Sequence, residues 1–340
     1  MSNSILLKIG EEFTRGAELS AEYAETTFDA LISETDEPLI AKVLLAWNRK
    51  GIESNEIFEI AKIMRNRMTH VTSRHERIVD IVGTGGSTAK TFNVSTAASF
   101  VTAAAGIPVA KHGNKAATSN SGSADVLSEL GIDPAVDAQT AEQCLNEIGI
   151  CFMFAPNYHR LSPTLAKVRR GLGFPTIFNC VGPLCNPASA THQLIGVWDD
   201  HLVPKMADAS RRLGTKRTWI VHGEKGLDEV AVNGKTKVAE IDGAIRTFEI
   251  DPEYFGLEQC KSDALRSADP AHSAQMIRNV LLGRPHDPAA EHIVLLNAAA
   301  ALYIAGAVVS PKDATDLARE SLTSGRARSK MEELAIAAPV

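Results

Sequence analysis

The chain lacks the features that mark membrane proteins, secreted proteins and general nucleic-acid binders. Its 340 residues contain no run of about 18 apolar residues, so we expect no membrane-spanning helix. Glu11 and Glu12 follow a short apolar stretch near the N-terminus, which is not the layout of a signal peptide. The formal net charge of -6 argues against general nucleic-acid binding, although it leaves room for a local basic site.

Cysteine is also scarce, and its pattern excludes a disulfide framework or a thiolate metal site. The five cysteines are odd in number and form no CxxC pair. They are Cys144, Cys151, Cys180, Cys185 and Cys260. We expect buried free thiols and therefore a reducing, cytoplasmic environment.

Residues 1–70 show the periodicity of packed helices. The segment "SAEYAETTFDALISE" begins at Ser20 with an acidic first turn, and "SNEIFEIAKIMRNRM" begins at Ser54; both serines are predicted helix caps. Between them, "PLIAKVLLAWNRKG" has apolar residues at helical spacing and stops at Gly51. These apolar faces serve either core packing or a subunit interface.

From Ile78 onward, short strand-like runs alternate with helical ones. The predicted strands are 78–82, 107–110, 150–155, 192–197 and 217–222. The helical segments "STAASFVTAAAG", "ADVLSELG", "LAKVRRGLG" and "KMADASRRLG" each end in a glycine. Hairpin-like sequence follows in "VAVNGKTKVAEIDGAIRTFEI", and "HIVLLNAAAALYIAGAVV" has the composition of a buried helix. We therefore predict a small helical domain over 1–70 and a large α/β domain with a mainly parallel sheet over 71–340, with some later helices returning to the small domain.

The stretch from Asp80 to Asp125 contains the first candidate site, a GTGG loop. Gly83, Gly85 and Gly86 would let backbone N–H groups approach an anion, and the helix that follows, with Ser95 and Thr96 at its predicted cap, adds its positive end. A simple tight turn is the alternative. The loop is not a Walker A motif and lacks the dinucleotide-binding GxGxxG spacing.

The second candidate is "KHGNKAATS", which follows the predicted strand 107–110. Lys111 could contact phosphate, while Asn114, Thr118 and Ser119 could hold sugar or phosphate oxygens. Ordinary surface polarity is the alternative reading.

The third candidate is the acidic pair Asp228 and Glu229, which comes after the apolar strand "TWIVHG". Parallel sheets present ligand sites at this end of their strands. Two carboxylates there suit Mg²⁺ shared with substrate phosphates, whereas a solvated turn is the plainer alternative.

The fourth candidate is "APNYHRLSPTLAKVRRGLG", where His159 and Arg169 are about three helical turns apart. An arginine fork recognises carboxylates, so Arg169 is a candidate ligand-binding residue and Arg170 is expected at the surface. No arrangement for covalent catalysis stands out, and His222 is expected to be a hydrogen-bonded core residue.

With these segments together, the chain resembles the anthranilate phosphoribosyltransferase family over nearly its whole length. "DIVGTGG", "TFNVSTA", "KHGN", "SGSADVL", "TIFNCVGPLCNPA" and "HGEKGLDE" occur in family order and spacing. The resemblance implies a class III phosphoribosyltransferase-like fold, a homodimer joined through the helical parts and a step of tryptophan biosynthesis. In that step the amine of anthranilate displaces pyrophosphate from phosphoribosyl pyrophosphate.

The resemblance also implies roles for individual residues. Phosphoribosyl pyrophosphate would be bound by Gly83, Gly85, Gly86, Ser87, Thr91, Asn93, Ser95, Thr96, Lys111, Thr118 and Ser119. Mg²⁺ would be held by Ser95, Asp228 and Glu229, and catalysis would depend on Lys111 and the acidic pair. Anthranilate would be bound by Gly83, His112, Asn114, His159 and Arg169.

The sequence departs from the family pattern at three places, and these departures leave the identity of the acceptor less certain than the type of reaction. Ser87 stands where the family has aspartate, Lys115 where it has arginine, and "RLSP" (160–163) where it has a Pro-Ala-Met-like run. A phosphoribosyltransferase for another aromatic acceptor is one alternative, and a non-catalytic relative that binds nucleic acid is another. Intact Lys111 and the acidic pair argue against the latter. Pyrimidine nucleoside phosphorylases share the expected fold but differ in the phosphate loop.

Overall fold

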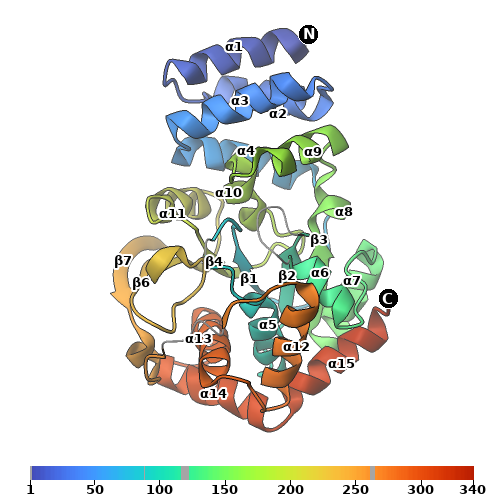
Figure 1. Ribbon diagram of the computed structural model, residues 1–340, viewed down its shortest axis with the longest axis vertical. Coiled ribbons are helices and arrows are strands. Elements are labelled where there is room, and N and C mark those ends of the chain that lie inside the picture. Colours follow the sequence, from blue (N-terminus) through green and yellow to red (C-terminus); the bar gives the residue numbers. More distant parts are fainter. Residues whose placement is uncertain (1, 88, 116–121, 261–264) are drawn as a thin grey trace.

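The computed structural model of the protein describes residues 2–87, 89–115, 122–260 and 265–340. Helices and strands alternate after an all-helical start (Figure 1). The N-terminal helices are α1 (Ser2–Thr14), α2 (Ala21–Ser33), α3 (Glu37–Lys50) and α4 (Ser54–Arg67). The strands are β1 (Val79–Gly83), β2 (Val109–Gly113), β3 (Ile150–Phe154), β4 (His192–Gly196), β5 (Arg217–Gly223), β6 (Thr236–Asp242) and β7 (Ala244–Ile250). The later helices are α5 (Val94–Ala104), α6 (Ser123–Glu129), α7 (Ala138–Ile148), α8 (Ala155–His159), α9 (Pro163–Leu172), α10 (Ile177–Leu184), α11 (Leu202–Arg212), α12 (Pro270–Leu281), α13 (Pro288–Ile304), α14 (Pro311–Thr323) and α15 (Arg326–Ala337), with 3-10 turns η1 (Glu224–Gly226) and η2 (Pro252–Phe255).

The strands form one sheet in the order β3-β2-β1-β4-β5-β6-β7. The first five run parallel, and β6 and β7 add an antiparallel hairpin at one edge. The predicted strands, the hairpin and the mainly parallel sheet are thus confirmed. Because the parallel strands share a direction, their carboxyl ends meet at one edge of the sheet, where α/β folds bind ligands.

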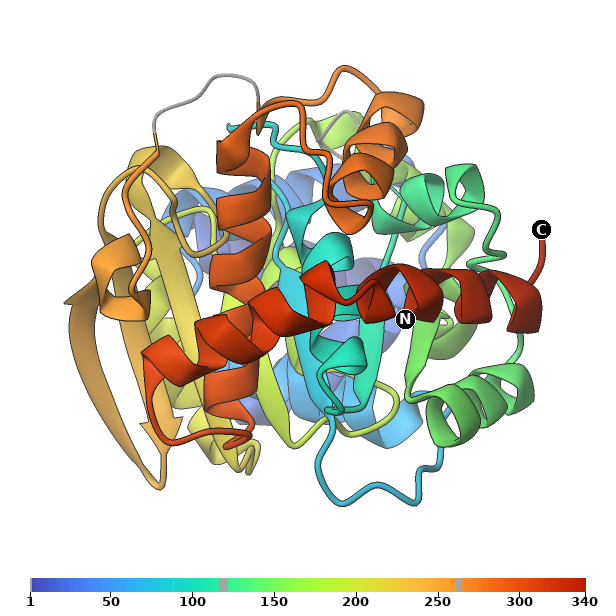
Figure 2. The ribbon, with the colours of Figure 1, turned by 90° about the horizontal axis from the view of Figure 1, so that it is seen from below.

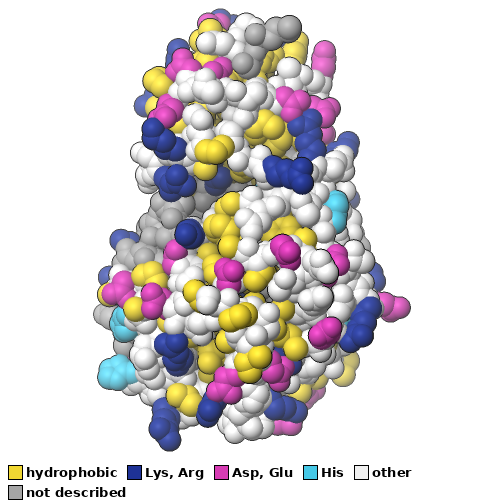
Figure 3. Space-filling model, turned by 90° about the vertical axis from the view of Figure 1, so that its right-hand side faces the viewer, with side chains coloured by type: hydrophobic (Ala, Val, Ile, Leu, Met, Phe, Trp, Pro, Cys, Tyr) yellow, Lys and Arg dark blue, Asp and Glu magenta, His cyan; other side chains and the backbone are white. Residues whose placement is uncertain are grey.

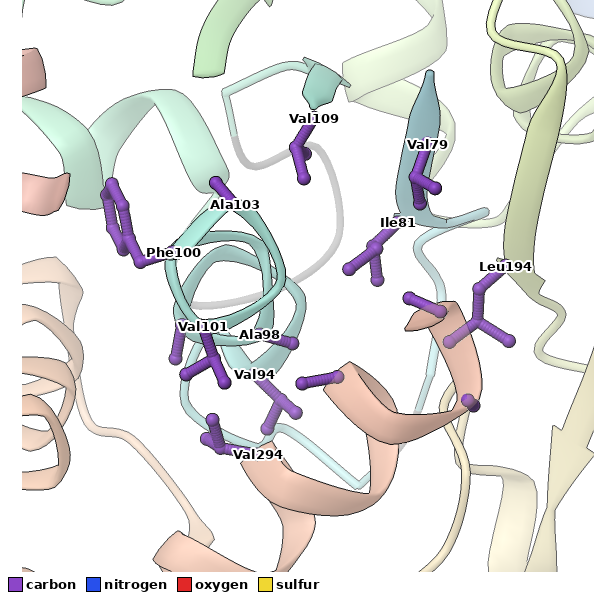
Figure 4. Close-up of a cluster of buried hydrophobic side chains, with 14 of the residues drawn as sticks. Val79, Ile81, Val94, Ala98, Phe100, Val101, Ala103, Val109, Leu194 and Val294 are labelled. Atoms are coloured by element: carbon purple, nitrogen blue, oxygen red, sulfur yellow. The ribbon is translucent and has the colours of Figure 1, made fainter. Parts of the chain in front are cut away.

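One face of the sheet packs against α5 and α13. Val79 and Ile81 of β1, with Leu194 of β4, point toward Val94 of α5 and Val294 of α13 (Figure 4). All five side chains are almost completely buried. The Ala- and Leu-rich composition of α13 is explained by this position, as predicted, since the helix is surrounded by apolar neighbours.

The other face of the sheet joins the N-terminal helices in a second core. Ile195 and Ile220, next along the strands to residues of the first core, pack here with residues of α4, α10 and α11. Helix α9 also contributes Leu165, so α9 and α10 lie with α1–α4 (Figure 1). The division into domains at residue 70 remains a prediction.

Helices α14 and α15 lie across the end of the molecule opposite the N-terminal helices, as Figure 2 shows from below. The five cysteines are unpaired, and four of them are buried. Among the described residues, no helix combines the length and apolar character needed to cross a bilayer.

The predicted helix ends are mostly confirmed, whereas the predicted caps need correction. Gly106, Gly131, Gly173 and Gly214 all have positive φ just beyond the helices they terminate. Ser20 is an N-cap residue without a side-chain cap bond. Helix α4 starts at Ser54 itself, and its cap is Glu53 with a capping box to Glu56.

Candidate active site

A cavity of about 250 Å³ opens at the carboxyl ends of the central strands. It is bordered by the GTGG loop after β1, the end of β2, the start of α5, the acidic pair after β5 and helix α10. Of the predicted site residues, those lining it are Gly83, Gly85, Gly86, Ser87, Thr91, Asn93, Ser95, Lys111, His112, Asn114, Arg169, Asp228 and Glu229. The structure therefore brings the four candidate segments into one space.

The GTGG loop bends back onto the acidic pair. Gly85 and Gly86 have φ of 66° and 98°, which glycine adopts without strain. The N–H of Gly85 donates to Oδ2 of Asp228 at 3.1 Å. A Cβ atom at Gly83 would lie 2.6 Å from the same oxygen, so a side chain there would displace the Asp228 carboxylate. The hydroxyl of Ser87 donates to the carbonyl of Gly226 at 2.9 Å and ties the loop to the segment before the acidic pair.

Helix α5 starts at the cavity, with a cap different from the predicted one. Asn93, not Ser95 or Thr96, is the N-cap, and its side chain accepts from the Thr96 N–H at 3.2 Å. Thr96 is buried and bonded to Asn93, and it does not line the cavity. Ser95, one position earlier, does face the cavity. The sequence pattern placed the cap too late because Ser and Thr are themselves good caps.

Lys111 and His112 lie inside β2, not in a loop after it, which corrects the predicted strand end at residue 110. Both side chains are buried. The ammonium group of Lys111 donates to the carbonyl of Ile81 at 2.7 Å and to Oγ of Ser95 at 3.0 Å. Burial lowers the pKa of Lys111 to about 8, while Asp80 and Glu229 oppose that shift. A buried cation with polar partners thus borders the cavity.

The acidic pair carries negative charge that the protein only partly compensates. Burial raises the pKa of Asp228 to about 6. Burial and the charge of Asp228 raise the pKa of Glu229 well above its usual range. Thr91 donates to Oε2 of Glu229 at 3.3 Å, but among the described residues neither carboxylate forms an ion pair with lysine or arginine.

This environment fits the Mg²⁺ that the family resemblance implies. The pair offers only oxygen donors, which Mg²⁺ prefers. Its raised pKa values indicate that a nearby positive charge would stabilise the ionised form. The Ser95 backbone N–H also bonds to Glu229, which places that residue beside the pair.

His112, which is buried, and His159, which is half-buried, form a histidine pair. Their Nε2 atoms are 2.9 Å apart and their rings meet edge to face. Burial lowers the pKa of His159 to about 4, and burial together with His159 lowers that of His112 well below its usual range. Both rings are therefore neutral at physiological pH. His159 does not line the cavity, but it contacts His112, which does.

Arg169 reaches the cavity from α9, but not along one helix with His159. Arg160 adopts a left-handed conformation after α8, and Ser162 caps a new helix by accepting from the Leu165 N–H at 3.1 Å. The two residues therefore lie on separate helices, because Ser162 and Pro163 start a new helix at this point. The Arg169 guanidinium lies 5.0 Å from the ring centroid of Phe178, and its buried Nε has no hydrogen-bond partner. Arg170 is exposed, as predicted.

Several cavity residues were not singled out from the sequence. Phe178, Asn179 and Pro183 come from α10, and Lys90 comes from the segment before α5. Asn179 donates to the carbonyl of Thr84 at 3.0 Å and so supports the GTGG loop. The available signal was a proline within the otherwise apolar α10. Thr118 and Ser119 lie outside the described residues, and His222 is half-buried with a bond to the Val197 carbonyl.

Comparison with known proteins gives one consistent result. The glycosyl transferase family, a/b domain, matches residues 75–328. Anthranilate phosphoribosyltransferases of Methanobrevibacter smithii and Methylobacterium nodulans are 40% and 44% identical to this chain, covering 98% and 94% of both proteins.

Solved structures agree with these sequence relatives. The enzyme of Thermus thermophilus has a TM-score of 0.88 and 35% identity, covering 97% of this chain and 98% of its own. The Saccharomyces cerevisiae enzyme, in complex with phosphoribosyl pyrophosphate and Mg, has a TM-score of 0.89 and 30% identity over 98% of both chains. With its α/β fold and a cavity that unites all four motifs, the chain belongs to the anthranilate phosphoribosyltransferase family.

Proposed function

We propose that the protein transfers the phosphoribosyl group of phosphoribosyl pyrophosphate to the amine of anthranilate and releases pyrophosphate. The observation that carries this proposal is the single cavity in which a glycine loop, a buried lysine, an acidic pair and a half-buried arginine meet. The first three suit a pyrophosphate with its cation, and the arginine suits a carboxylate.

The donor is assigned to the side of the cavity formed by the GTGG loop and α5. The backbone of Gly83, Gly85 and Gly86, the start of α5 and the ammonium of Lys111 offer hydrogen-bond donors and positive charge to phosphate oxygens. The side chains assigned to this group are Ser87, Thr91, Asn93, Ser95 and Thr96, with Thr118 and Ser119 assigned by family resemblance alone. Thr96 would act through Asn93, since it is buried behind it.

Ser95, Asp228 and Glu229 would hold Mg²⁺. When bound, the cation neutralises the charge that develops on the departing pyrophosphate. The pair itself is fixed by Gly85 and Thr91, so its oxygens are oriented before the ligands bind. The yeast relative was solved with phosphoribosyl pyrophosphate and Mg, which supports the use of Mg²⁺.

The acceptor is assigned to the side formed by α10 and the end of β2. Arg169, stacked over Phe178 with an unpaired buried Nε, would bind the carboxylate. His112 and Asn114 border the same space, and His159 holds His112. A yeast relative was solved with 4-fluoroanthranilate, which supports an anthranilate-like compound as the acceptor.

The reaction follows from this arrangement. The anthranilate nitrogen bonds to the anomeric carbon while the bond from that carbon to the pyrophosphate oxygen breaks, and one amine proton is released. Positive charge grows on the ribose and negative charge on the pyrophosphate. Lys111 and the loop amides stabilise the latter, and holding both substrates in line supplies much of the remaining rate enhancement. The neutral nucleophile requires no covalent enzyme intermediate.

Binding of nucleic acid is not favoured. Figure 3 shows lysine and arginine side chains interspersed with aspartate and glutamate on that face of the molecule, with no continuous basic patch among its described residues. The net charge of -6 points the same way. A homodimer joined through the helical part and a cytoplasmic location belong to the same proposal, and the free cysteines support the latter.

An acceptor screen tests the function. Purified protein with phosphoribosyl pyrophosphate and Mg²⁺ should release pyrophosphate with anthranilate and its ring-substituted analogues. Release with other aromatic amines but not with anthranilate would refute the proposed acceptor and keep the donor chemistry.

A further inference from the structure

Asn297 is a buried amide in the middle of an apolar helix. Helix α13 buries thirteen residues, of which twelve are apolar, and Asn297 is the exception at 1% exposure. Burying an amide is unfavourable unless its hydrogen bonds are satisfied. The side chain must therefore have partners that justify its position.

Those partners are the backbone groups of the residue that follows the acidic pair. Oδ1 of Asn297 accepts from the Val230 N–H at 3.0 Å, and Nδ2 donates to the Val230 carbonyl at 3.2 Å. Nδ2 also donates to the Ile293 carbonyl at 2.9 Å within its own helix. The amide thus hydrogen-bonds to both backbone groups of Val230, as the backbone of a neighbouring strand would. Val230 itself belongs to no strand.

The segment after Glu229 needs such support because it is irregular. The Ala231 N–H donates to Oγ1 of Thr236 at 2.9 Å, and the Val232 carbonyl accepts from the Cys260 N–H at 2.9 Å. Neither contact reaches Val230. Among the described residues, Asn297 is the side chain that hydrogen-bonds to both the N–H and the carbonyl of Val230, the residue directly after Glu229.

We infer that Asn297 is a positioning residue for the acidic pair: its amide fixes the backbone of Val230 and thereby the direction in which Glu229 presents its carboxylate to the Mg²⁺–donor site. This inference rests on the proposed function. Helix α13 is itself packed against β1, β4 and α5, so the amide transmits the rigidity of the core to the cavity. Groups that support ligand residues in this way tune metal affinity without touching the metal.

The test compares Asn297→Leu with Thr315→Val. Leucine has the same branched arrangement of four side-chain heavy atoms as asparagine but cannot form hydrogen bonds with Val230. Thr315 is also buried, in α14, and donates to the Phe255 carbonyl at 2.8 Å away from the cavity residues, so its variant controls for loss of a buried hydrogen bond. Phosphoribosyl pyrophosphate is titrated into each full-length protein by calorimetry at a series of Mg²⁺ concentrations, and the melting temperature is measured in parallel.

At low Mg²⁺, Asn297→Leu should bind the donor at least about tenfold more weakly than wild type, as for other outer supports of metal ligands. This difference in donor affinity should become smaller as the Mg²⁺ concentration is raised. Thr315→Val should bind the donor as wild type does at every Mg²⁺ concentration. Asn297→Thr, which keeps one hydrogen-bonding group, should be intermediate and serves if the leucine variant does not fold. A folded Asn297 variant with the wild-type Mg²⁺ dependence would overturn the inference. Wild-type protein that binds no donor at any Mg²⁺ concentration would instead refute the proposed function.

Discussion

The ammonium group of Lys111, in β2, lies 3.0 Å from the hydroxyl oxygen of Ser95, in the first turn of α5. This contact joins two motifs that are separated in the chain and sets a cation beside a residue assigned to Mg²⁺ and donor binding. Since Lys111 also bonds to the Ile81 carbonyl, its position is fixed from two sides. The donor half of the site is therefore largely organised before any ligand enters.

Replacing Lys111 with methionine should abolish most activity while preserving the fold. The substitution keeps the length of the buried chain and removes the charge. We expect kcat/KM for the donor to fall by about 10²- to 10³-fold, equivalent to roughly 3–4 kcal/mol of lost transition-state stabilisation. Steady-state kinetics measures the loss of activity, and circular dichroism checks that the fold is preserved. Lys167→Met, at an exposed lysine that pairs with Glu37, is the matched control, and equal activity of the two variants would contradict the role of Lys111.

Glu229→Gln should separate stability from activity. Burial and Asp228 raise the pKa of Glu229, so its ionised form destabilises the folded protein at neutral pH. A neutral amide removes that repulsion. We expect a melting temperature at or above that of wild type together with a large loss of turnover and a higher Mg²⁺ requirement. A variant with normal turnover would show that the carboxylate is not needed.

Gly196, the last residue of β4, should tolerate no side chain. A Cβ atom there would lie 1.7 Å from the backbone oxygen of Asp228, and the backbone cannot move away as a flexible side chain could. We expect Gly196→Ala to lower the free energy of unfolding by about 1–3 kcal/mol or more and to weaken donor binding, because Asp228 must shift. Denaturant unfolding and donor titration measure these effects.

Gly171 in α9 provides the control for that substitution. A Cβ atom at Gly171 would meet nothing within 4 Å, and its φ is not positive. Gly171→Ala should therefore raise the free energy of unfolding by about 0.5–1 kcal/mol, because alanine is the better helix former. If Gly196→Ala is as stable as Gly171→Ala, the close approach to Asp228 does not constrain the site.

The pH dependence of stability should report the histidine pair. Burial lowers the pKa of His159 from 6.5 to about 4. Between these two pH values His159 is protonated in the unfolded chain but neutral in the folded protein. The contribution of His159 to the free energy of unfolding is fully present above about pH 6.5 and is lost as the pH falls toward 4. Each such histidine adds up to about 1.4 kcal/mol per pH unit to the slope. His159→Asn should flatten the plot of unfolding free energy against pH by about that amount, and an unchanged slope would place His159 in solvent.

Much of the fold could be predicted because its signals are local. Five strands, the hairpin and the glycine-terminated helices all follow from patterns within about ten residues. The position of Lys111 inside β2 could not be predicted, because its polar partners, Ile81 and Ser95, come from other elements. That some later helices pack with the N-terminal helices was expected, but not that these would be α9 and α10, because that packing depends on tertiary contacts.

The candidate site was predictable where ligand-binding chemistry needs unusual residues in a row. GTGG, the acidic pair and Arg169 all line the cavity. Phe178 and Asn179 were missed because an apolar helix gives no sign of which residues face a ligand. Asn297 did leave a signal, a single amide in a run of alanine and leucine, but its partner Val230 became evident only in three dimensions.

Release of pyrophosphate tests the central claim most directly. Protein is mixed with phosphoribosyl pyrophosphate and Mg²⁺, and pyrophosphate is measured with and without anthranilate, alongside Lys111→Met. We predict rapid release that requires anthranilate, yields phosphoribosyl anthranilate in equal amount and is nearly lost in the variant. No anthranilate-dependent release by the folded wild-type protein would contradict the account.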